Sequence, residues 1–224
     1  AGLPDGIFDI INGGQEAVEA LCDNEEIGAL SFVGSTRVAK IVYGRAAQTG
    51  KRVLCLGGAK NHLIVVPDAD LELTAQNVTA SYTGCAGQRC MAASVMVAVG
   101  DVDQIIDAVV EHSKRIELGK DLGAIVNEAS VERITRYINE AEAQGAKILV
   151  DGRGTSGANG YWVGPTLIDH VSPDMPAAKE EIFGPVLVMM PYDSIEEAIS
   201  VANDTPYGLA GYVQSGRSEE RRGG

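Results

Sequence analysis

Hydrophobic and polar positions along this chain alternate between a period of two and a period near 3.6, which predicts an α/β fold with parallel strands. Short apolar runs typical of buried strands occur at residues 8–12, 29–32, 52–56, 63–66, 94–99, 147–150, 165–169, 186–190 and 211–214. Helical spacing occurs at 15–22, 36–49, 71–82, 102–110 and 131–142. Residues 6–56 therefore predict a βαβαβ unit, and the glycine-rich stretch 152–160 predicts a surface turn or hairpin arm.

Composition narrows the class of partner. The 224 residues, 45% of them hydrophobic, can bury a sizeable core in one large or two small domains. Eighteen basic against 31 acidic residues give a net charge of −13, so a nucleic acid partner is not expected. The longest uncharged apolar runs are too short to span a bilayer, so no membrane partner is expected either. A small-molecule substrate fits this composition better.

The four cysteines and three histidines show neither C-x-x-C pairing nor a histidine cluster. No metal site is therefore expected. Their spacing also does not resemble a disulfide framework, which predicts a reducing compartment: the cytoplasm, or the mitochondrial matrix in a eukaryote.

Both ends of the sequence resemble the interior of a longer chain. Gly2 and Pro4 are typical of residues that follow a helix, and residues 215–224 are polar and arginine-rich, as in a disordered tail. We therefore expect an internal fragment of a larger protein.

The segment 83–92 sets a cysteine among small residues between two apolar periodic segments. Gly84 and Gly87 allow positive φ and close approach to a substrate, and Arg89 directly before Cys90 favours the thiolate, the form that attacks carbon. Cys90 is thus a candidate nucleophile. The alternative is a small buried hydrophobic residue, which is the commoner role of an isolated cysteine. Cys85 is the rival nucleophile, but it has no cationic neighbour in the sequence.

Four motifs occur in order: Gly-Ser-Thr at 34–36, Leu-Gly-Gly-Ala-Lys-Asn at 56–61, Gly-Gln-Arg-Cys at 87–90 and Glu-Glu-Ile-Phe-Gly-Pro at 180–185. Together they resemble the aldehyde dehydrogenase superfamily, and most closely its CoA-acylating methylmalonate-semialdehyde dehydrogenases. The resemblance covers about residues 1–214. It implies a partial Rossmann-type NAD domain at 1–58, an incomplete α/β catalytic domain at 59–214 and a disordered tail at 215–224. It also implies a homo-oligomer, a dimer or tetramer, for the full-length protein.

The resemblance implies that Gly34 and Ser35 contact the NAD pyrophosphate at a helix N-terminus, where the helix dipole favours an anion. It further implies that Glu181 holds the nicotinamide ribose hydroxyls and that Phe183 packs beside them, both fixed at the end of a strand by the turn at 184–185. Taken alone, Ser35 could simply cap its helix, Glu181 could be an exposed acid and Phe183 a core aromatic.

By the same resemblance Cys90 forms a thioester with the oxidised aldehyde. Hydrolytic relatives use a glutamate to activate water, and the corresponding position here is Leu56 or, on another alignment, Cys55. Neither can act as a carboxylate base, so coenzyme A is the implied acyl acceptor. Arg89 is then expected to bind a substrate carboxylate, as in a short (methyl)malonate-type semialdehyde, although it could be a surface arginine that only promotes the thiolate. A hydrolytic dehydrogenase and a non-catalytic fragment remain the alternatives.

Overall fold

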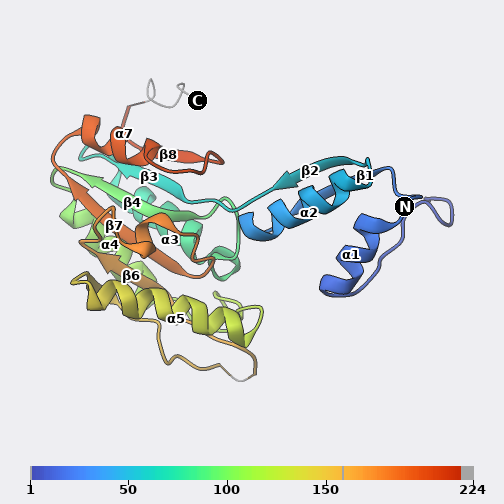
Figure 1. Ribbon diagram of the computed structural model, residues 1–224. Coiled ribbons are helices and arrows are strands. Elements are labelled where there is room, and N and C mark those ends of the chain that lie inside the picture. The colour runs from blue at the N-terminus through green and yellow to red at the C-terminus, as the bar shows by residue number, and fades with distance from the viewer. Residues whose placement is uncertain (1, 158, 218–224) are drawn as a thin grey trace. The chain divides into compact units, whose positions relative to one another are not determined.

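The computed structural model describes residues 2–157 and 159–217 (Figure 1). It divides into two compact units, residues 1–58 and residues 59–224, which are described separately. The expected tail at 215–224 lies largely outside the described residues, since only 215–217 are among them. Within the described residues, no helix has the length and apolar character needed to cross a membrane.

The first unit is a helix–strand–helix–strand arrangement. Its elements are α1 (Gln15–Asp23), β1 (Ala29–Val33), α2 (Thr36–Gln48) and β2 (Arg52–Leu56). The two strands pair in parallel, and alternate residues of each turn toward the helices, as the period of two predicts. Cys22, Val42 and Ala46 form its small buried core.

The strand predicted at 8–12 is absent, so the expected βαβαβ unit is wrong in its first element. Phe8 and Ile10 are 71% and 74% exposed, and no described strand pairs with this segment. A β-strand needs a neighbour to satisfy its backbone N–H and C=O groups, so an apolar run alone does not make one.

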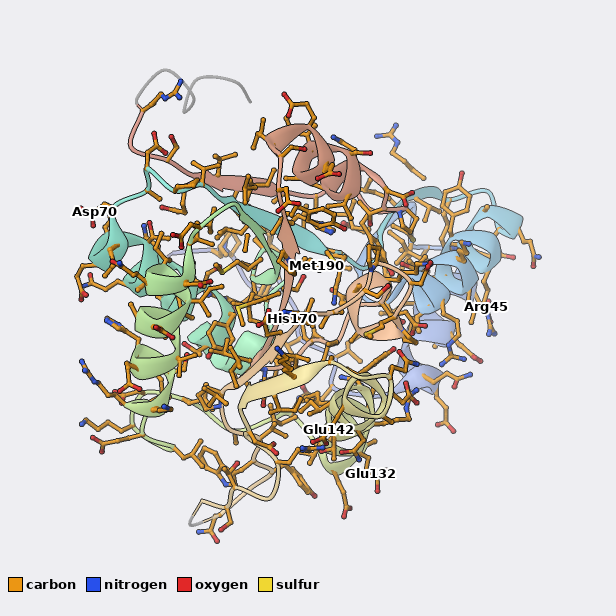
Figure 2. The ribbon with its side chains drawn as sticks, turned by 90° about the vertical axis from the view of Figure 1, so that its left-hand side faces the viewer. Arg45, Asp70, Glu132, Glu142, His170 and Met190 are labelled. Atoms are coloured by element: carbon orange, nitrogen blue, oxygen red, sulfur yellow. The ribbon has the colours of Figure 1, made fainter. Side chains whose placement is uncertain are left out.

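An ion-pair cluster joins the two helices of the first unit. Arg45 of α2 donates to both carboxylate oxygens of Asp23, at 2.8 and 2.6 Å, and also pairs with Glu19 at 2.8 Å. Figure 2 labels Arg45 on this unit. Because all three side chains are partly exposed, the cluster orients α1 on α2 more than it stabilises the fold.

The second unit is built on a six-stranded sheet of order β5-β6-β7-β4-β3-β8. The strands are β3 (Asn61–Val65), β4 (Ala93–Val99), β5 (Lys147–Val150), β6 (Thr166–Asp169), β7 (Val186–Tyr192) and β8 (Gly211–Gln214). All six were predicted from the apolar runs, within one to two residues at most ends. The pairing is parallel, as expected, except between β5 and β6, which are antiparallel at that edge of the sheet.

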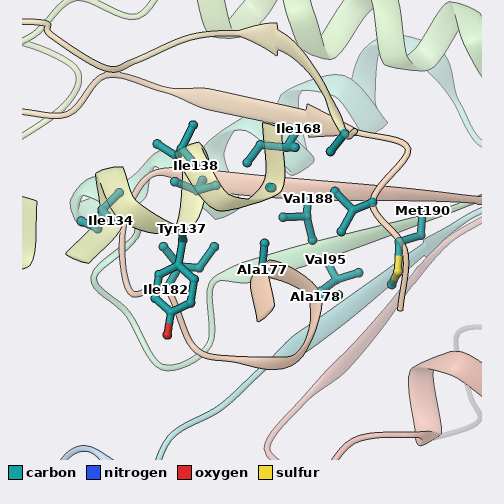
Figure 3. Packing of buried hydrophobic residues seen from close by; sticks show 14 of the residues in the cluster. Val95, Ile134, Tyr137, Ile138, Ile168, Ala177, Ala178, Ile182, Val188 and Met190 are labelled. Carbon is teal, nitrogen blue, oxygen red and sulfur yellow. The ribbon is translucent and has the colours of Figure 1, made fainter. Parts of the chain in front are cut away.

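Helices cover both faces of this sheet. One face carries α3 (Leu71–Thr83) and α4 (Asp103–Lys114), and the other carries α5 (Glu128–Ala143), α6 (Pro176–Lys179) and α7 (Ile195–Asn203). Along β7, Val188 and Met190 face the second group, whereas Leu187 and Met189 face the first. Figure 3 shows side chains of α5 and α6 packed on the strands here. Burial on both faces explains why these strands read as continuous apolar runs.

Three helices of this unit, α3, α5 and α7, begin at side-chain caps. Asp70, labelled in Figure 2, accepts a hydrogen bond from the backbone N–H of Leu73 at 2.8 Å, which places the start of α3 where the sequence predicts it. The helices α6 and α7 were not predicted. For α7 a signal existed, because Ser194 and Glu197 form the capping-box pattern, and the Ser194 hydroxyl accepts from the Glu197 N–H at 3.2 Å.

Candidate active site

Cys90 lies in a tight turn between a left-handed segment and β4. After α3 the chain enters the short 3-10 turn η1 (Gly84–Gly87), in which Cys85, Ala86 and Gly87 have φ values of 52°, 54° and 67°. The thiols of Cys85 and Cys90 are both free and both exposed. The alternative that Cys90 is a small buried hydrophobic residue is therefore wrong.

Hydrogen bonds from several elements hold this turn. The Ala92 N–H donates to the Arg89 carbonyl at 3.1 Å, and the amide of Asn61, on β3, donates to the carbonyls of Cys90 and Ala92 at 2.7 and 2.9 Å. Tyr212, on β8, donates to the Met91 carbonyl at 2.9 Å. Burial raises the pKa of the Tyr212 phenol, and the nearby Arg89 partly offsets that rise. Sequence reasoning missed Asn61 and Tyr212.

The guanidinium of Arg89 is hydrogen-bonded to backbone carbonyls of α3. Its Nη2 donates to the carbonyls of Ala80 and Ser81, at 3.1 and 2.7 Å, in the last turn of α3. A cation is favourable at a helix C-terminus, whose last carbonyls have no intrahelical partner. Gly84 lies directly against this guanidinium, since a Cβ there would lie 2.4 Å from Nη2 and would displace the arginine side chain. Binding of a substrate carboxylate by Arg89 stays a prediction.

Two neighbours link the cysteine loop to other loops of the second unit. The Gln88 side chain donates to the carbonyls of Cys85 and Ala124 at 3.2 Å each and accepts from the Val126 N–H at 3.0 Å. Gly87 lies against the backbone of Gly184, where a Cβ on Gly87 would come within 1.9 Å of the Gly184 oxygen. The loop that carries Cys90 is thereby fixed beside the loop that carries Glu181 and Phe183.

Glu181 and Phe183 lie in the loop between α6 and β7. This corrects the prediction that they sit at the end of a strand: the turn at Gly184 precedes β7 instead of following a strand. Phe183 has a φ of 54° and is 38% exposed, so the alternative of a core aromatic is wrong. Glu181 is half-buried and accepts from the Ala59 N–H at 3.2 Å, and burial raises its pKa.

The second unit brings four of the predicted site residues together. Arg89, Cys90, Glu181 and Phe183 line one small cavity of 20 Å³, with Asn61 in its wall. That volume holds about one water molecule. A thiol, a carboxylate and an aromatic ring therefore meet at one place, although they are far apart in the sequence.

Lys60 supports this arrangement from inside the sheet. It is 2% exposed, and its ammonium donates to the carbonyls of Ala177 and Glu180 at 2.7 and 2.8 Å. Burial lowers its pKa to about 7, while the charges of Glu181 and Glu180 act in the opposite direction. Tyr137 of α5 donates to the side chain of Glu180. The loop that carries Glu180 and Glu181 is thus held by Lys60 and by Tyr137 of α5. The signal for this in the sequence was a lysine and an asparagine at the start of an apolar strand.

The remaining two predicted residues lie in the first unit, at the start of α2. Ser35 caps the helix by accepting from the Val38 N–H at 3.4 Å. Gly34 makes room for the ring of Phe32, since a Cβ would lie 2.7 Å from it, and its N–H donates to the Leu56 carbonyl at 3.2 Å. Capping by Ser35 is therefore present, and contact with a cofactor stays a prediction for both residues.

The positions aligned with the hydrolytic glutamate lie at the end of β2. Leu56 is 50% exposed, and Cys55 is partly buried, which raises the pKa of its thiol. Neither side chain supplies a carboxylate.

Comparison with known proteins tests the resemblance. The sequence model described as "Aldehyde dehydrogenase family" matches residues 1–222. The malonate-semialdehyde dehydrogenase of Pseudomonas aeruginosa is 43% identical over 219 residues, covering 93% of this chain and 44% of that protein. The mitochondrial acylating methylmalonate-semialdehyde dehydrogenase of Arabidopsis thaliana is 45% identical over 217 residues, covering 93% of this chain and 36% of that protein.

Solved structures agree. A methylmalonate-semialdehyde dehydrogenase from Oceanimonas doudoroffii superposes with a TM-score of 0.93 at 40% identity, covering 99% of this chain and 48% of that one. A structure from Sinorhizobium meliloti, described by the same activity and complexed with NAD, gives the same score and identity, with 99% and 47% covered. The chain spans less than half the length of each of these proteins. The resemblance predicted from the sequence is thus confirmed, and the chain belongs to the aldehyde dehydrogenase family.

Proposed function

We propose that the protein formed with this chain oxidises a short (methyl)malonate-type semialdehyde with NAD, through a thioester on Cys90, and transfers the acyl group to coenzyme A. The observation that carries the proposal is the exposed Cys90 thiol, in a hydrogen-bonded turn that shares a cavity with Glu181 and Phe183. The names of the relatives, which specify malonate and methylmalonate semialdehyde, support the substrate class.

The residues present fit the chemistry of NAD. One carboxylate oxygen of Glu181 is occupied by the Ala59 N–H, and within the described residues no hydrogen bond reaches the other, which can accept from a ribose diol. Phe183 is 38% exposed and lines the same cavity. Gly34 and Ser35 stand at the N-terminus of a 13-residue helix, a favourable place for a pyrophosphate. When bound, the nicotinamide supplies a hydride acceptor.

The chemistry of the chain centres on Cys90. Its thiolate adds to the aldehyde carbon, and the resulting oxyanion needs a fixed donor. Within the described residues the Cys90 N–H donates no hydrogen bond, so it is free for this task. Loss of hydride re-forms the carbonyl as a thioester. A coenzyme A thiol then adds, releases its proton to solvent and expels the Cys90 thiolate, giving acyl-CoA.

The absence of a glutamate at position 55 or 56 supports transfer of the acyl group to coenzyme A. With Leu56 or Cys55 where a hydrolytic enzyme has its glutamate, water is not activated there and the thioester persists for a thiol. A guanidinium at position 89 would hold the substrate carboxylate. A β-carboxy thioester then loses carbon dioxide, and the enolate that remains takes a proton from solvent. We place this activity in the cytoplasm or the mitochondrial matrix, in a dimer or tetramer.

The test uses the complete gene product, with malonate semialdehyde, NAD and coenzyme A. We expect NADH and acyl-CoA in equal amounts, with NADH formation dependent on coenzyme A. Free acid formed at full rate without coenzyme A would indicate a hydrolytic enzyme, and no NADH under any condition would indicate a non-catalytic protein.

Exchange of the two exposed cysteines tests the nucleophile. Cys90→Ala should abolish hydride transfer, whereas Cys85→Ala, five residues away and equally exposed, should leave most of it. Equal loss in both variants would contradict the assignment of Cys90.

A further inference from the structure

Three consecutive carbonyls at the nucleophile are each bound by a side chain from a neighbouring strand. Asn61, on β3, donates to the carbonyls of Cys90 and Ala92. Tyr212, on β8, donates to the carbonyl of Met91 between them. β3 and β8 are adjacent parallel strands, with His62 opposite Gly211 in register, so their N-terminal ends reach the same turn. Asn61 ends the motif at 56–61, but neither side chain has a role in the proposed chemistry.

These bonds fix the conformation of Cys90 itself. The peptide group before Cys90 is held because the Arg89 carbonyl accepts from the Ala92 N–H, and the peptide group after it is held because the Cys90 carbonyl accepts from Asn61. With both flanking peptide planes fixed, φ and ψ of Cys90 are fixed, and so are the directions of its Cα–Cβ bond and its N–H. The Met91 carbonyl, bound by Tyr212, prevents the next peptide group from rotating.

The two side chains differ in how firmly they are built in. Asn61 is 2% exposed, so it is part of the interior, and its amide nitrogen donates two hydrogen bonds to the turn. Tyr212 is half-buried in the wall of a cleft of 440 Å³ next to Lys60 and His62, and its phenol is its only polar atom. Removing that hydroxyl changes one hydrogen bond and little packing.

We propose that Asn61 and Tyr212 are positioning residues, which hold the Cys90 N–H in the direction where it stabilises the oxyanion formed when the thiolate adds to a carbonyl. This inference rests on the proposed function for the role of Cys90. It goes beyond that function in assigning the orientation of the oxyanion donor to two side chains that have no role in the proposed chemistry.

The test compares two reactions of the same thiol in the 224-residue chain, without NAD or coenzyme A. Acylation by p-nitrophenyl acetate passes through a tetrahedral oxyanion, whereas alkylation by iodoacetamide is a displacement at saturated carbon that forms none. The ratio of the two rates therefore reports on the backbone donor and cancels changes in exposure or thiolate content. Trypsin cuts after Lys60 and Arg89, so Cys85 and Cys90 fall in separate peptides and mass spectrometry reads each one.

Tyr212→Phe is the main variant, and Asn61→Ala, checked for folding, is the second. Tyr161→Phe and Asn77→Ala, which alter exposed side chains elsewhere in the same unit, are the matched controls. We expect the acylation-to-alkylation ratio at Cys90 to fall about tenfold in both variants, because a displaced donor loses much of its effect. The ratio should stay unchanged in the controls, as should alkylation of Cys85 in every variant.

A ratio that is unchanged in folded Tyr212→Phe would overturn the proposal, even if Asn61→Ala fails to fold. So would an equal fall in both rates, which is the signature of a purely structural role, or a wild-type Cys90 that is alkylated but never acylated. Failure of the proposed dehydrogenase function is a separate result, because it is read from NADH in the complete gene product.

Discussion

The close approach of Gly87 to Gly184 makes Gly87→Ala an informative perturbation. Two costs add at this position. An alanine must adopt φ of 67°, which costs about 1–2 kcal/mol. Its Cβ would also lie 1.9 Å from the Gly184 oxygen, whereas real Cβ contacts stay beyond 3.0 Å, so the two backbones must separate by about 1 Å. Displacing packed backbone by that amount costs about 1–3 kcal/mol more.

The chain contains a matched control for the first cost. Gly154 has φ of 69°, nearly the same as Gly87, but a Cβ there would meet nothing within 4 Å. Gly154→Ala should therefore reduce the free energy of unfolding by about 1–2 kcal/mol and Gly87→Ala by about 2–5 kcal/mol. The difference between the two variants isolates the steric contact from the backbone conformation.

Denaturant unfolding followed by tryptophan fluorescence measures both variants. Trp162 is the only tryptophan and lies half-buried in the second unit, so the signal reports on the unit that contains both glycines. If Gly87→Ala loses no more stability than Gly154→Ala, the two loops are not packed backbone against backbone, and the rigid placement of Cys90 beside Glu181 is refuted.

Three further predictions concern other parts of the chain. The pKa of Lys60 is about 7 in the folded state and 10.5 in a free lysine, so between these values the unfolded chain binds more protons and the free energy of unfolding rises with pH. In Lys60→Met this rise, up to about 1.4 kcal/mol per pH unit, should disappear from denaturation curves. The same pH dependence in the variant and the wild type would contradict the prediction. Tyr82→Phe removes a buried hydrogen bond of 2.6 Å to Ser113 and should lower the free energy of unfolding by about 1 kcal/mol, whereas the exposed Tyr161→Phe should not change the denaturation midpoint. Ser35→Gly keeps most of the helix-capping preference but removes the hydroxyl. Weaker NAD binding by the complete gene product, with unchanged helix content in circular dichroism, would support a cofactor contact. Unchanged NAD binding would show that Ser35 only caps its helix.

Most of the fold could be predicted because both faces of the main sheet are buried. Strand segments such as 95–99 and 186–190 are apolar at every position, and α5 repeats its apolar residues at helical spacing, so local pattern and tertiary environment agree. The strand expected at 8–12 failed because the pattern records which side chains are apolar and not whether a partner strand is present. The helix α6, four residues long, is too short for any period to show.

The candidate site was predicted only where a family motif marks it. Cys90 and Glu181 lie in such motifs, and the structure brings them to one cavity. Asn61 lies in the motif at 56–61, but the contacts of Asn61 and Tyr212 could not be predicted, since their partners are backbone carbonyls 29 and 121 residues away, and a carbonyl has no residue type. The positive φ of Phe183 was equally hidden, because phenylalanine has no preference for this backbone region.

The left-handed run before the nucleophile constrains which sequences this loop tolerates. Cys85 and Ala86 occupy a backbone region that costs an L-residue about 1–2 kcal/mol each, whereas glycine enters it freely. In a saturation-mutagenesis library, glycine and asparagine should therefore be enriched at position 85 and valine, isoleucine and threonine depleted, although the side chain there is exposed. At position 86, which is fully buried, only glycine should be accepted besides the native alanine. The tolerance of this loop is thus set by backbone handedness and not by chemistry, and Cys85 can be exchanged for a residue without sulfur at no cost to the turn.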